Sequence, residues 1–363
     1  MKLLICPDSF KGTLSAQRVA TTVWSAAQAV LPGAEGRLLP MSDGGEGSSE
    51  CFSFLGATRR TLTVTGPDGV PLEAGYMLLP DGKTAYVESA EACGLEKTSR
   101  RDPSSATTFG VGELIRDAAT HAETILLGLG GSATNDMGLG MLAALGFTFY
   151  NKNGEAYVPV GKTLSDLASF SGPSSPLPRV KALCDVTNPL YGPMGAAAIY
   201  GPQKGADPEM VEMLDQGLRH ASDIIAPDLA AAPGAGAAGG LGFAVKSVLG
   251  GKLAGGFDLI SQAVGLPEAL AWADLVITGE GKLDHQSVMG KVIGGIAKQA
   301  MIKGVPLLVV CGMAEENDAI YNAGVHAVFP CTRYKPNALP SPEEAEKALY
   351  HTCENIFRML RIQ

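Results

Sequence analysis

The apolar and polar residues at the start of the chain follow a pattern of repeated strand–turn–helix units. Lys2–Cys6 is a nearly continuous apolar run, which is typical of a parallel strand buried on both faces. After a break, Ser15–Ala29 has helical periodicity, with Ser15 as the expected N-cap. A strand over Arg37–Met41 and a helix over Ser48–Leu55 repeat the unit. This repetition predicts a doubly wound parallel sheet.

The pattern changes near Thr58. Three segments have the composition of short strands, and the turns between them contain Pro-Asp-Gly, a hairpin signal. These segments are Thr61–Thr65, Leu72–Leu79 and Thr84–Glu88. Helical and strand segments then mix as far as Asp185, and a loop-rich stretch follows. We interpret this middle part as a second α/β domain.

The α/β alternation returns near the C-terminus. Strands are expected at Ala273–Thr278, Pro306–Cys311 and His326–Phe329, and helices at Ser287–Lys303 and Ser341–Ile362. The two ends of the chain, residues 1–58 plus 265–363, therefore predict one Rossmann-like doubly wound parallel sheet. The second α/β domain, residues 59–264, is expected to be inserted into it, with an active-site cleft between the two domains.

Composition and charge exclude several classes of protein. The 363 residues are 46% hydrophobic and 18% charged, as in a folded chain long enough for two domains. A net charge of −9 without a basic block argues against nucleic-acid binding. The seven cysteines are isolated, which argues against a zinc site and suits a reducing compartment. With no apolar run of about 18 residues and no signal peptide, we expect a cytoplasmic protein that does not enter a membrane.

The most informative turn is Ile125–Asp136, which follows an apolar strand and precedes a predicted helix over Met137–Leu145. Its small residues would let a phosphate approach the backbone, and the helix N-terminus would supply N–H donors. These small residues are Gly130, Gly131, Ser132 and Thr134. Asp136 beside them could hold Mg²⁺ or orient a substrate hydroxyl. The turn matches neither a Walker loop nor the dinucleotide fingerprint, so a tight strand–helix turn is the alternative interpretation.

Ligands of doubly wound sheets bind at the ends of strands. Other predicted strand ends in this chain also carry polar residues. They are Pro7–Gly12 with Asp8, Ser9 and Lys11; Ser42–Gly47 with Asp43 and Glu46; Cys184–Pro189 with Asp185 and Asn188; and Ala273–Asp284 with Gly279, Glu280, Gly281 and Asp284, followed by Lys291. Acidic residues beside a phosphate need a counter-charge, which Mg²⁺ or a lysine supplies. Each turn taken alone is also compatible with an ordinary turn or helix cap.

Two glycine-rich loops lie in the middle of the chain, at residues 201–206 and 233–242. Lys204 in the first loop could contact an anion, but a solvated lysine is the favoured interpretation. The second loop could be a flexible cover over a ligand, but an ordinary structural loop is the favoured interpretation.

An ordered series of motifs makes the chain similar to the type I glycerate kinase family over nearly its full length. The motifs are PDSFKG at 7–12, SDGGEG at 42–47, RDP and TTFGVGELI between 101 and 115, GGSATND at 130–136, DVTNPL at 185–190, GPQKGA at 201–206, PGAGAAGGLG at 233–242 and TGEGKLDHQS with a Gly-Lys pair between 278 and 291. Two positions depart from the family pattern: Lys282 replaces the usual arginine, and Val292-Ile293 stand where proline is common. Lysine lacks the planar fork of arginine, so it does not offer the two-point contact that arginine makes.

The resemblance implies an ATP-dependent kinase that phosphorylates D-glycerate, with Mg²⁺, in two α/β domains. It favours 2-phosphoglycerate over 3-phosphoglycerate as the product. A homodimer is considered as the assembly. Two rival classes are a non-catalytic protein that kept the scaffold and an NAD-dependent oxidoreductase, but the acidic residues at the strand ends oppose the first. The second would need a GxGxxG turn after the first strand, which is absent.

Residue type and position then assign expected roles within such a kinase. Lys11, Asp43 and Asp185 are the catalytic candidates, with the choice of base and Mg²⁺ ligand between the two carboxylates left open. Nucleotide binding is expected of Gly130, Gly131, Ser132, Thr134, Gly279, Gly281 and Lys291. Substrate binding is expected of Asp8, Ser9, Glu46, Asn188 and Asp284, and metal binding of Asp136 and Glu280. Phosphoryl transfer requires such positioning and charge neutralisation more than covalent chemistry.

Overall fold

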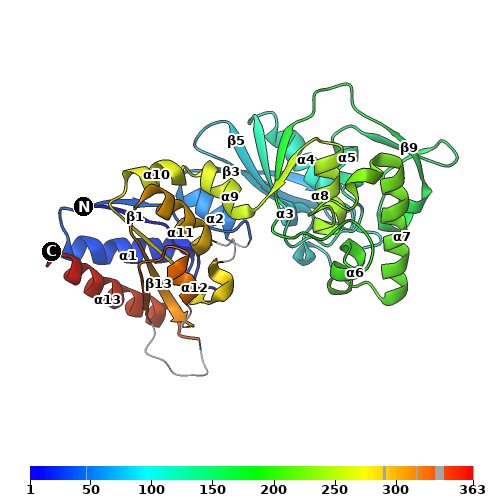
Figure 1. Cartoon of the computed structure of the whole chain (residues 1–363). Helices are drawn as coiled ribbons and strands as arrows, with labels where there is room; N and C mark the ends of the chain where they lie inside the picture. The colour runs from blue at the N-terminus through cyan, green and yellow to red at the C-terminus, as the bar shows by residue number, and fades with distance from the viewer. Residues whose placement is uncertain (46, 289–291, 316–317, 332–338, 363) are drawn as a thin grey trace. The chain divides into compact units, whose positions relative to one another are not determined.

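The computed structural model divides the chain into two compact units (Figure 1). Unit 1 consists of Met1–Leu55 and Phe257–Gln363, and unit 2 consists of Gly56–Gly256. The structure describes residues 1–45, 47–288, 292–315, 318–331 and 339–362. Each unit is built around a sheet of its own.

Unit 1 contains a five-stranded sheet in the order β14-β13-β12-β1-β2, and every neighbouring pair is parallel. Its strands are β1 (Lys2–Ile5), β2 (Glu35–Leu38), β12 (Leu275–Leu283), β13 (Leu307–Ala314) and β14 (Ala327–Pro330). The order places β1, the first strand of the chain, beside β12 from its last third. The predicted doubly wound parallel sheet is confirmed, because strands from both ends of the chain pair within it.

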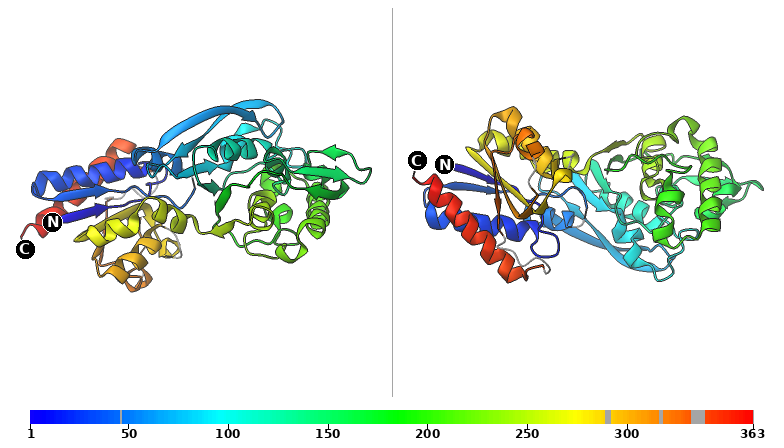
Figure 2. Two further views of the ribbon diagram at one scale, coloured as in Figure 1. Left: turned by 90° about the horizontal axis from the view of Figure 1, so that it is seen from above. Right: turned by 60° about the horizontal axis from the view of Figure 1, so that its bottom comes forward.

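Helices cover both faces of this sheet (Figure 2). The helices of this part of the chain are α1 (Ala16–Val30), α2 (Ser48–Phe54), α9 (Gly256–Ala263), α10 (Leu266–Trp272), α11 (Val292–Lys303), α12 (Asp318–Asn322) and α13 (Pro342–Leu360), with a 3₁₀ turn at His285–Val288. Helices α1 and α13 lie on one face, and α10 and α11 lie on the other. The apolar stripe of α1, which includes Val19 and Val23, packs in one core with Leu349 and Phe357 of α13.

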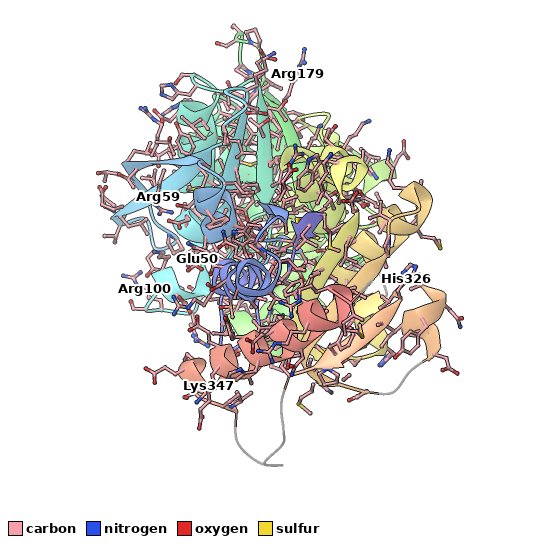
Figure 3. The ribbon with its side chains drawn as sticks, turned by 90° about the vertical axis from the view of Figure 1, so that its left-hand side faces the viewer. Glu50, Arg59, Arg100, Arg179, His326 and Lys347 are labelled. Carbon is pink, nitrogen blue, oxygen red and sulfur yellow. The ribbon has the colours of Figure 1, made fainter. Side chains whose placement is uncertain are left out.

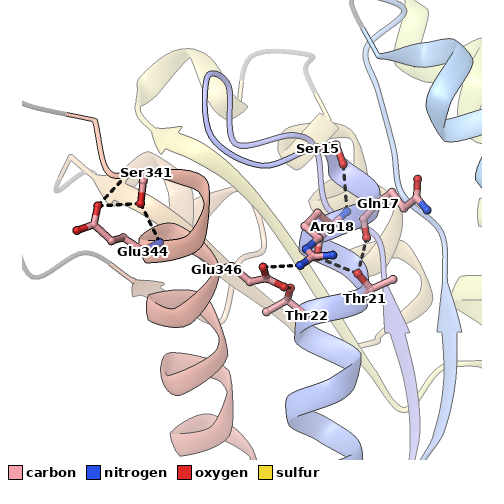
Figure 4. Close-up of polar contacts among 8 residues, drawn as sticks. All are labelled: Ser15, Gln17, Arg18, Thr21, Thr22, Ser341, Glu344 and Glu346. Carbon is pink, nitrogen blue, oxygen red and sulfur yellow. Dashed lines mark hydrogen bonds and ion pairs between the residues drawn. The ribbon is translucent and has the colours of Figure 1, made fainter.

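Local signals explain where α1 and α13 begin. The Oγ atom of Ser15 accepts a hydrogen bond from the backbone N–H of Arg18 at 3.2 Å, as expected of an N-cap. In α13, Ser341 and Glu344 form a reciprocal capping box. Figure 4 shows both caps and the ion pair at 2.8 Å between Arg18 and Glu346, which links the two helices.

Unit 2 contains a six-stranded sheet in the order β11-β10-β6-β5-β4-β3 and a small sheet in the order β8-β7-β9. The strands are β3 (Thr58–Thr65), β4 (Pro71–Leu78), β5 (Thr84–Glu88), β6 (Thr124–Gly128), β7 (Thr148–Asn151), β8 (Ala156–Tyr157), β9 (Leu167–Ser171), β10 (Arg179–Leu183) and β11 (Lys252–Ala254). The pairs β3·β4 and β4·β5 are antiparallel, whereas β5, β6, β10 and β11 run parallel.

The helices of unit 2 contain glycines at close contacts with neighbouring segments. They are α3 (Ser89–Cys93), α4 (Phe109–Ala118), α5 (Leu139–Ala144), α6 (Ala196–Tyr200), α7 (Pro208–Ile225) and α8 (Ala237–Ser247), with 3₁₀ turns at Leu95–Lys97, Gly161–Asp166, Pro202–Lys204 and Pro227–Leu229. A Cβ atom at Gly112 of α4 would lie 2.2 Å from the carbonyl oxygen of Met141 in α5. Some of the many glycines therefore serve helix packing and not ligand binding.

Two glycine-rich segments form regular structure where the sequence suggested loops or turns. Residues 237–242 of the segment considered as a flexible cover belong to α8, and Gly239 and Gly240 in it are buried with positive φ. A Cβ atom at Gly239 would lie 2.0 Å from the carbonyl oxygen of Thr134, so close backbone packing requires glycine there. The strand expected to end at Thr278 instead continues as β12 to Leu283.

Charged side chains lie mainly at the surface, as Figure 3 shows for Glu50, Arg59, Arg179 and Lys347. The described helices include none that combines the length and the apolar character needed to cross a membrane.

The capping box of α13 yields a stability prediction. We expect Ser341→Ala to lower the stability of the protein by about 1 kcal/mol, because the N–H of Glu344 loses its acceptor, the Oγ atom of Ser341. The thermal midpoint should fall by roughly 2–4 °C, measured by circular dichroism. Lys347→Ala, at an exposed position of the same helix, is the control and should cause no loss. An unchanged midpoint for Ser341→Ala would show that the cap contributes nothing.

Candidate functional site

A cavity of about 520 Å³ lies in unit 1 where the chain leaves β1 and β2. Because β1 and β2 are parallel neighbours, the segments that follow them leave the same edge of the sheet. The backbone N–H of Met41 donates to the carbonyl oxygen of Pro7 at 2.8 Å and ties the two segments together. The polar residues lining the cavity include Asp8, Ser9, Lys11, Asp43 and Glu50. Four of the predicted site residues, from two separate motifs, are thus brought together.

Asp8 is one of the carboxylates that line this cavity. Its Oδ1 atom accepts a hydrogen bond at 2.6 Å from the backbone N–H of Ser9. Its own N–H donates to the carbonyl oxygen of Gly279 in β12 at 2.8 Å. Burial raises the pKa of Asp8 to about 6, and the negative charge of Asp43 adds to this effect while Lys11 opposes it. A carboxylate with such a pKa can exchange a proton near neutral pH.

The turn after β2 positions Asp43 through its own hydrogen bonds. The Oδ1 atom of Asp43 accepts from the N–H of Gly45 at 3.0 Å, and Ser42 Oγ accepts from the N–H of Gly44 at 3.2 Å. Gly44 and Gly47 have φ values of 93° and 88°, which favour glycine. The glycines of this motif therefore shape the turn that carries Asp43. Glu46, predicted to bind substrate, lies outside the described residues.

The residues expected to form a glycine turn near Gly279 belong to β12 instead. A Cβ atom at Gly279 would lie 2.2 Å from the carbonyl oxygen of Val310, and one at Gly281 would lie 3.2 Å from the backbone nitrogen of Lys11. These glycines allow β13 and the cavity loop to approach, which explains them without a nucleotide. Their predicted nucleotide-binding role stays a prediction, and Lys291 lies outside the described residues.

The acidic residues of β12 and the segment after it have different surroundings. Glu280 is a half-buried residue of β12 that pairs in register with Cys311. Lys282 forms ion pairs with Glu315 at 2.6 Å and with Asp284 at 3.8 Å. Among the residues that the structure describes, no three His, Cys, Asp or Glu side chains form a group able to hold a metal ion. The metal-binding role of Glu280 and the substrate-binding role of Asp284 stay predictions.

In unit 2, Asp136 occupies an interior position. Its carboxylate accepts hydrogen bonds from the N–H and the Oγ1 hydroxyl of Thr108, both at 2.8 Å, and from the N–H of Gly138 at 3.0 Å. The side chain is fully buried, and burial raises its pKa while these hydrogen bonds oppose the rise. This geometry favours a structural role that joins the starts of α4 and α5, whereas the metal-binding role stays a prediction.

The helix after the Gly130–Asp136 turn begins later than predicted, at Leu139. The N–H groups near its start are already used, since Gly138 and Gly140 donate to Asp136 and Met141 donates to Thr108 Oγ1. The expectation that this helix would present free donors to a phosphate was wrong. Within the turn itself, Gly130 and Gly131 are exposed, and the chain becomes buried from Ser132 onward.

Lys204 was missed as a residue of this region because a solvated lysine was the favoured interpretation. Its side chain is 2% exposed. Its Nζ atom donates to the carbonyl oxygen of Thr134 at 2.7 Å and to Ser132 Oγ at 3.1 Å. The only signal in the sequence is its place between glycines in the GPQKGA motif, which says nothing about burial.

Asp185 and Asn188 lie after β10, which is the parallel neighbour of β6. The exposed Asp185 accepts a hydrogen bond from the N–H of Gly256 at 2.9 Å. Asn188 donates to the carbonyl oxygen of Met194 at 2.8 Å and accepts from the Tyr200 hydroxyl at 2.6 Å. The amide of Asn188 therefore supports its own loop. The turns after β6 and β10 leave one edge of the sheet of unit 2, as the turns after β1 and β2 do in unit 1.

Comparison with known proteins identifies the family of the chain. The model of the glycerate kinase family matches residues 3–361. The chain belongs to the glycerate kinase family. A glycerate kinase of Bacillus subtilis is 42% identical, over 99% of this chain and 96% of the relative. The glycerate 2-kinase of Escherichia coli is 39% identical, also over 99% of this chain and 96% of the relative. The crystal structure of a putative glycerate kinase 2 from Salmonella typhimurium is 38% identical, has a TM-score of 0.90 and covers 100% of this chain and 98% of its own.

The matches confirm two predictions from the sequence, the membership of this family and the α/β fold. Within this glycerate kinase family member, the cavity that contains Asp8, Asp43 and Lys11 is the candidate active site of unit 1. The turn at Gly130–Asp136 and the residues after β10 form a second candidate region, in unit 2.

The pKa of Asp8 gives a prediction about stability and pH. The folded protein raises this pKa from 3.8 to about 6, so ionisation of Asp8 destabilises the fold. The contribution of Asp8 to the free energy of unfolding therefore falls as the pH rises from about 4 to 6. We expect Asp8→Asn to gain on the order of 2 kcal/mol relative to the wild type between pH 4 and pH 7. Urea unfolding at both pH values measures this. Asp258→Asn, at an exposed position of α9, is the control; a gain as small as that of the control would show that Asp8 is not perturbed.

Proposed function

We propose that the chain catalyses the ATP-dependent phosphorylation of D-glycerate to 2-phosphoglycerate. The observation that carries the proposal is the cavity of unit 1, in which Asp8, Asp43 and Lys11 come together in a member of the glycerate kinase family. The name of the Escherichia coli relative, glycerate 2-kinase, supports position 2 of glycerate as the acceptor.

The residues of the cavity suit the acceptor substrate. Glycerate has one carboxylate and two hydroxyl groups, so its site needs a cation and a proton acceptor. Lys11 supplies the cation, as an exposed lysine at the edge of the cavity. Asp8 and Asp43 supply two carboxylates, of which the one that binds the reacting hydroxyl accepts its proton as the phosphoryl group is transferred.

The proposed cofactor is Mg²⁺, which would neutralise charge on the phosphates. This ion usually binds one or two carboxylates together with phosphate oxygens. The carboxylates of Asp8 and Asp43 fit that requirement because they lie in the same cavity and carry no ion pair among the described contacts. Asp185, exposed after β10, stays the alternative for the base or the metal ligand.

Three further expectations belong to the proposal. The first is a location in the cytoplasm, a reducing compartment, which the seven free cysteines support. The second is a homodimer, which sedimentation velocity tests. The third is a division into one domain of residues 1–58 plus 265–363 and an inserted domain of residues 59–264, which limited proteolysis tests.

The first test is an assay of ADP release with ATP, Mg²⁺ and D-glycerate. We expect ADP formation that depends on D-glycerate, and ³¹P NMR should show the phosphorus resonance of 2-phosphoglycerate. L-Glycerate and lactate are controls for stereochemistry and for the second hydroxyl. Absence of ADP formation would refute the kinase proposal, whereas 3-phosphoglycerate as the product would refute only the position.

The second test separates the carboxylates. Asp43→Asn and Asp185→Asn should each lower kcat by roughly 10²–10⁴-fold if the residue acts as base or metal ligand. Asp166→Asn, an exposed carboxylate of unit 2, is the matched control. Wild-type turnover in a folded Asp43→Asn or Asp185→Asn variant would remove that residue from the chemistry.

A further inference from the structure

Lys204 is a buried cation that contacts the turn at Gly130–Asp136 in unit 2. Its side chain is 2% exposed, and both of its hydrogen bonds go to that turn, to Ser132 Oγ and to the carbonyl oxygen of Thr134. Most lysines are exposed, because burying an unpaired ammonium group costs roughly several kcal/mol of free energy. The position of Lys204 therefore requires an explanation.

The described surroundings of Lys204 balance its charge poorly. In the parts of the chain that the structure describes, no ion pair within 4.0 Å joins Lys204 to a carboxylate. Burial lowers the pKa of Lys204 to about 8, although Cys93 and Asp136 favour its charged form. The carboxylate of Asp136 is itself held by Thr108 and Gly138. A further negative charge near the turn would stabilise the ammonium group.

The turn above Lys204 is arranged to accept such a charge. The carbonyl oxygens of Gly131 and Thr134, which would repel an anion, are engaged by the N–H of Leu95 at 2.9 Å and by Lys204. Gly130 and Gly131 are exposed, and a Cβ atom at Gly130 would meet no atom within 4 Å. Since Ser132 Oγ accepts its hydrogen bond from Lys204, the hydroxyl hydrogen can be donated to another acceptor.

We propose that Lys204 is a positioning residue that makes the turn at Gly130–Ser132 a binding site for the phosphate chain of the nucleotide. The positive charge of Lys204 attracts the phosphates from the protein interior. The hydroxyl of Ser132, which accepts a hydrogen bond from Lys204, donates its own hydrogen to a phosphate oxygen on the outer side of the turn. The inference rests on the proposed kinase function, and it assigns the phosphates of ATP to unit 2.

The test compares Lys204→Met with the wild type. Methionine preserves the shape of the side chain and removes the charge. We expect KM for ATP to rise on the order of 10- to 100-fold, the effect of losing a hydrogen-bonding charge, while KM for D-glycerate changes less than threefold. Isothermal titration calorimetry with tripolyphosphate should show a similar loss of affinity without any need for catalysis. Lys162→Met is the matched control, because the exposed Lys162 also donates to a serine hydroxyl, that of Ser105 at 3.0 Å.

The outcomes distinguish the inference from the kinase proposal. An active Lys204→Met variant with KM for ATP within twofold of the wild type would overturn the inference and leave the kinase proposal intact. Tripolyphosphate binding that depends on Lys204 in a protein unable to phosphorylate glycerate would support the inference and refute the kinase proposal. If Lys204→Met does not fold, Ser132→Ala decides: an affinity for tripolyphosphate lowered about 2- to 10-fold supports the inference, and an unchanged affinity overturns it.

Discussion

The parallel pairing of β1 with β2 and β12 is the constraint on which the candidate active site of unit 1 depends. Parallel strands end at one edge of a sheet, so the segments that follow them must meet there. This is how Asp8 and Asp43, separated along the chain, come to line one cavity. The hydrogen bond from Asp8 to the carbonyl oxygen of Gly279 adds support from a strand of the last third of the chain. The site would lose its geometry if any of these three strands shifted in register.

Much of the fold could be predicted because its signals are local. Continuous apolar runs marked β1 and β13, and Ser15 and Ser341 marked the starts of α1 and α13. The family motifs indicated which turns are candidates for the site. The extent of β12 was not predictable in this way, because Gly279 and Gly281 read as a turn although they permit close contact with Val310 and Lys11. Glycine has the same appearance in a sequence whether it frees the backbone or makes room for a neighbour.

The site of unit 2 shows a different limit of sequence reasoning. Asp136 and Lys204 are polar residues in polar-looking loops, and nothing local distinguishes a buried charge from a solvated one. Their burial arises from contacts distant along the chain, such as Thr108 with Asp136 and Ser132 with Lys204. Hydrogen bonds to the backbone and to hydroxyl groups make burial of these charges tolerable.

The anchoring of the turn between β6 and α5 also bears on the entropy of binding. Leu95, Gly239 and Lys204 hold its carbonyl and N–H groups at 2.9, 3.0 and 2.7 Å. A loop fixed in this way loses little conformational freedom when a ligand arrives, so less of the interaction energy is spent on ordering it. Binding of the proposed phosphate chain is therefore expected to leave the backbone of this turn nearly unchanged.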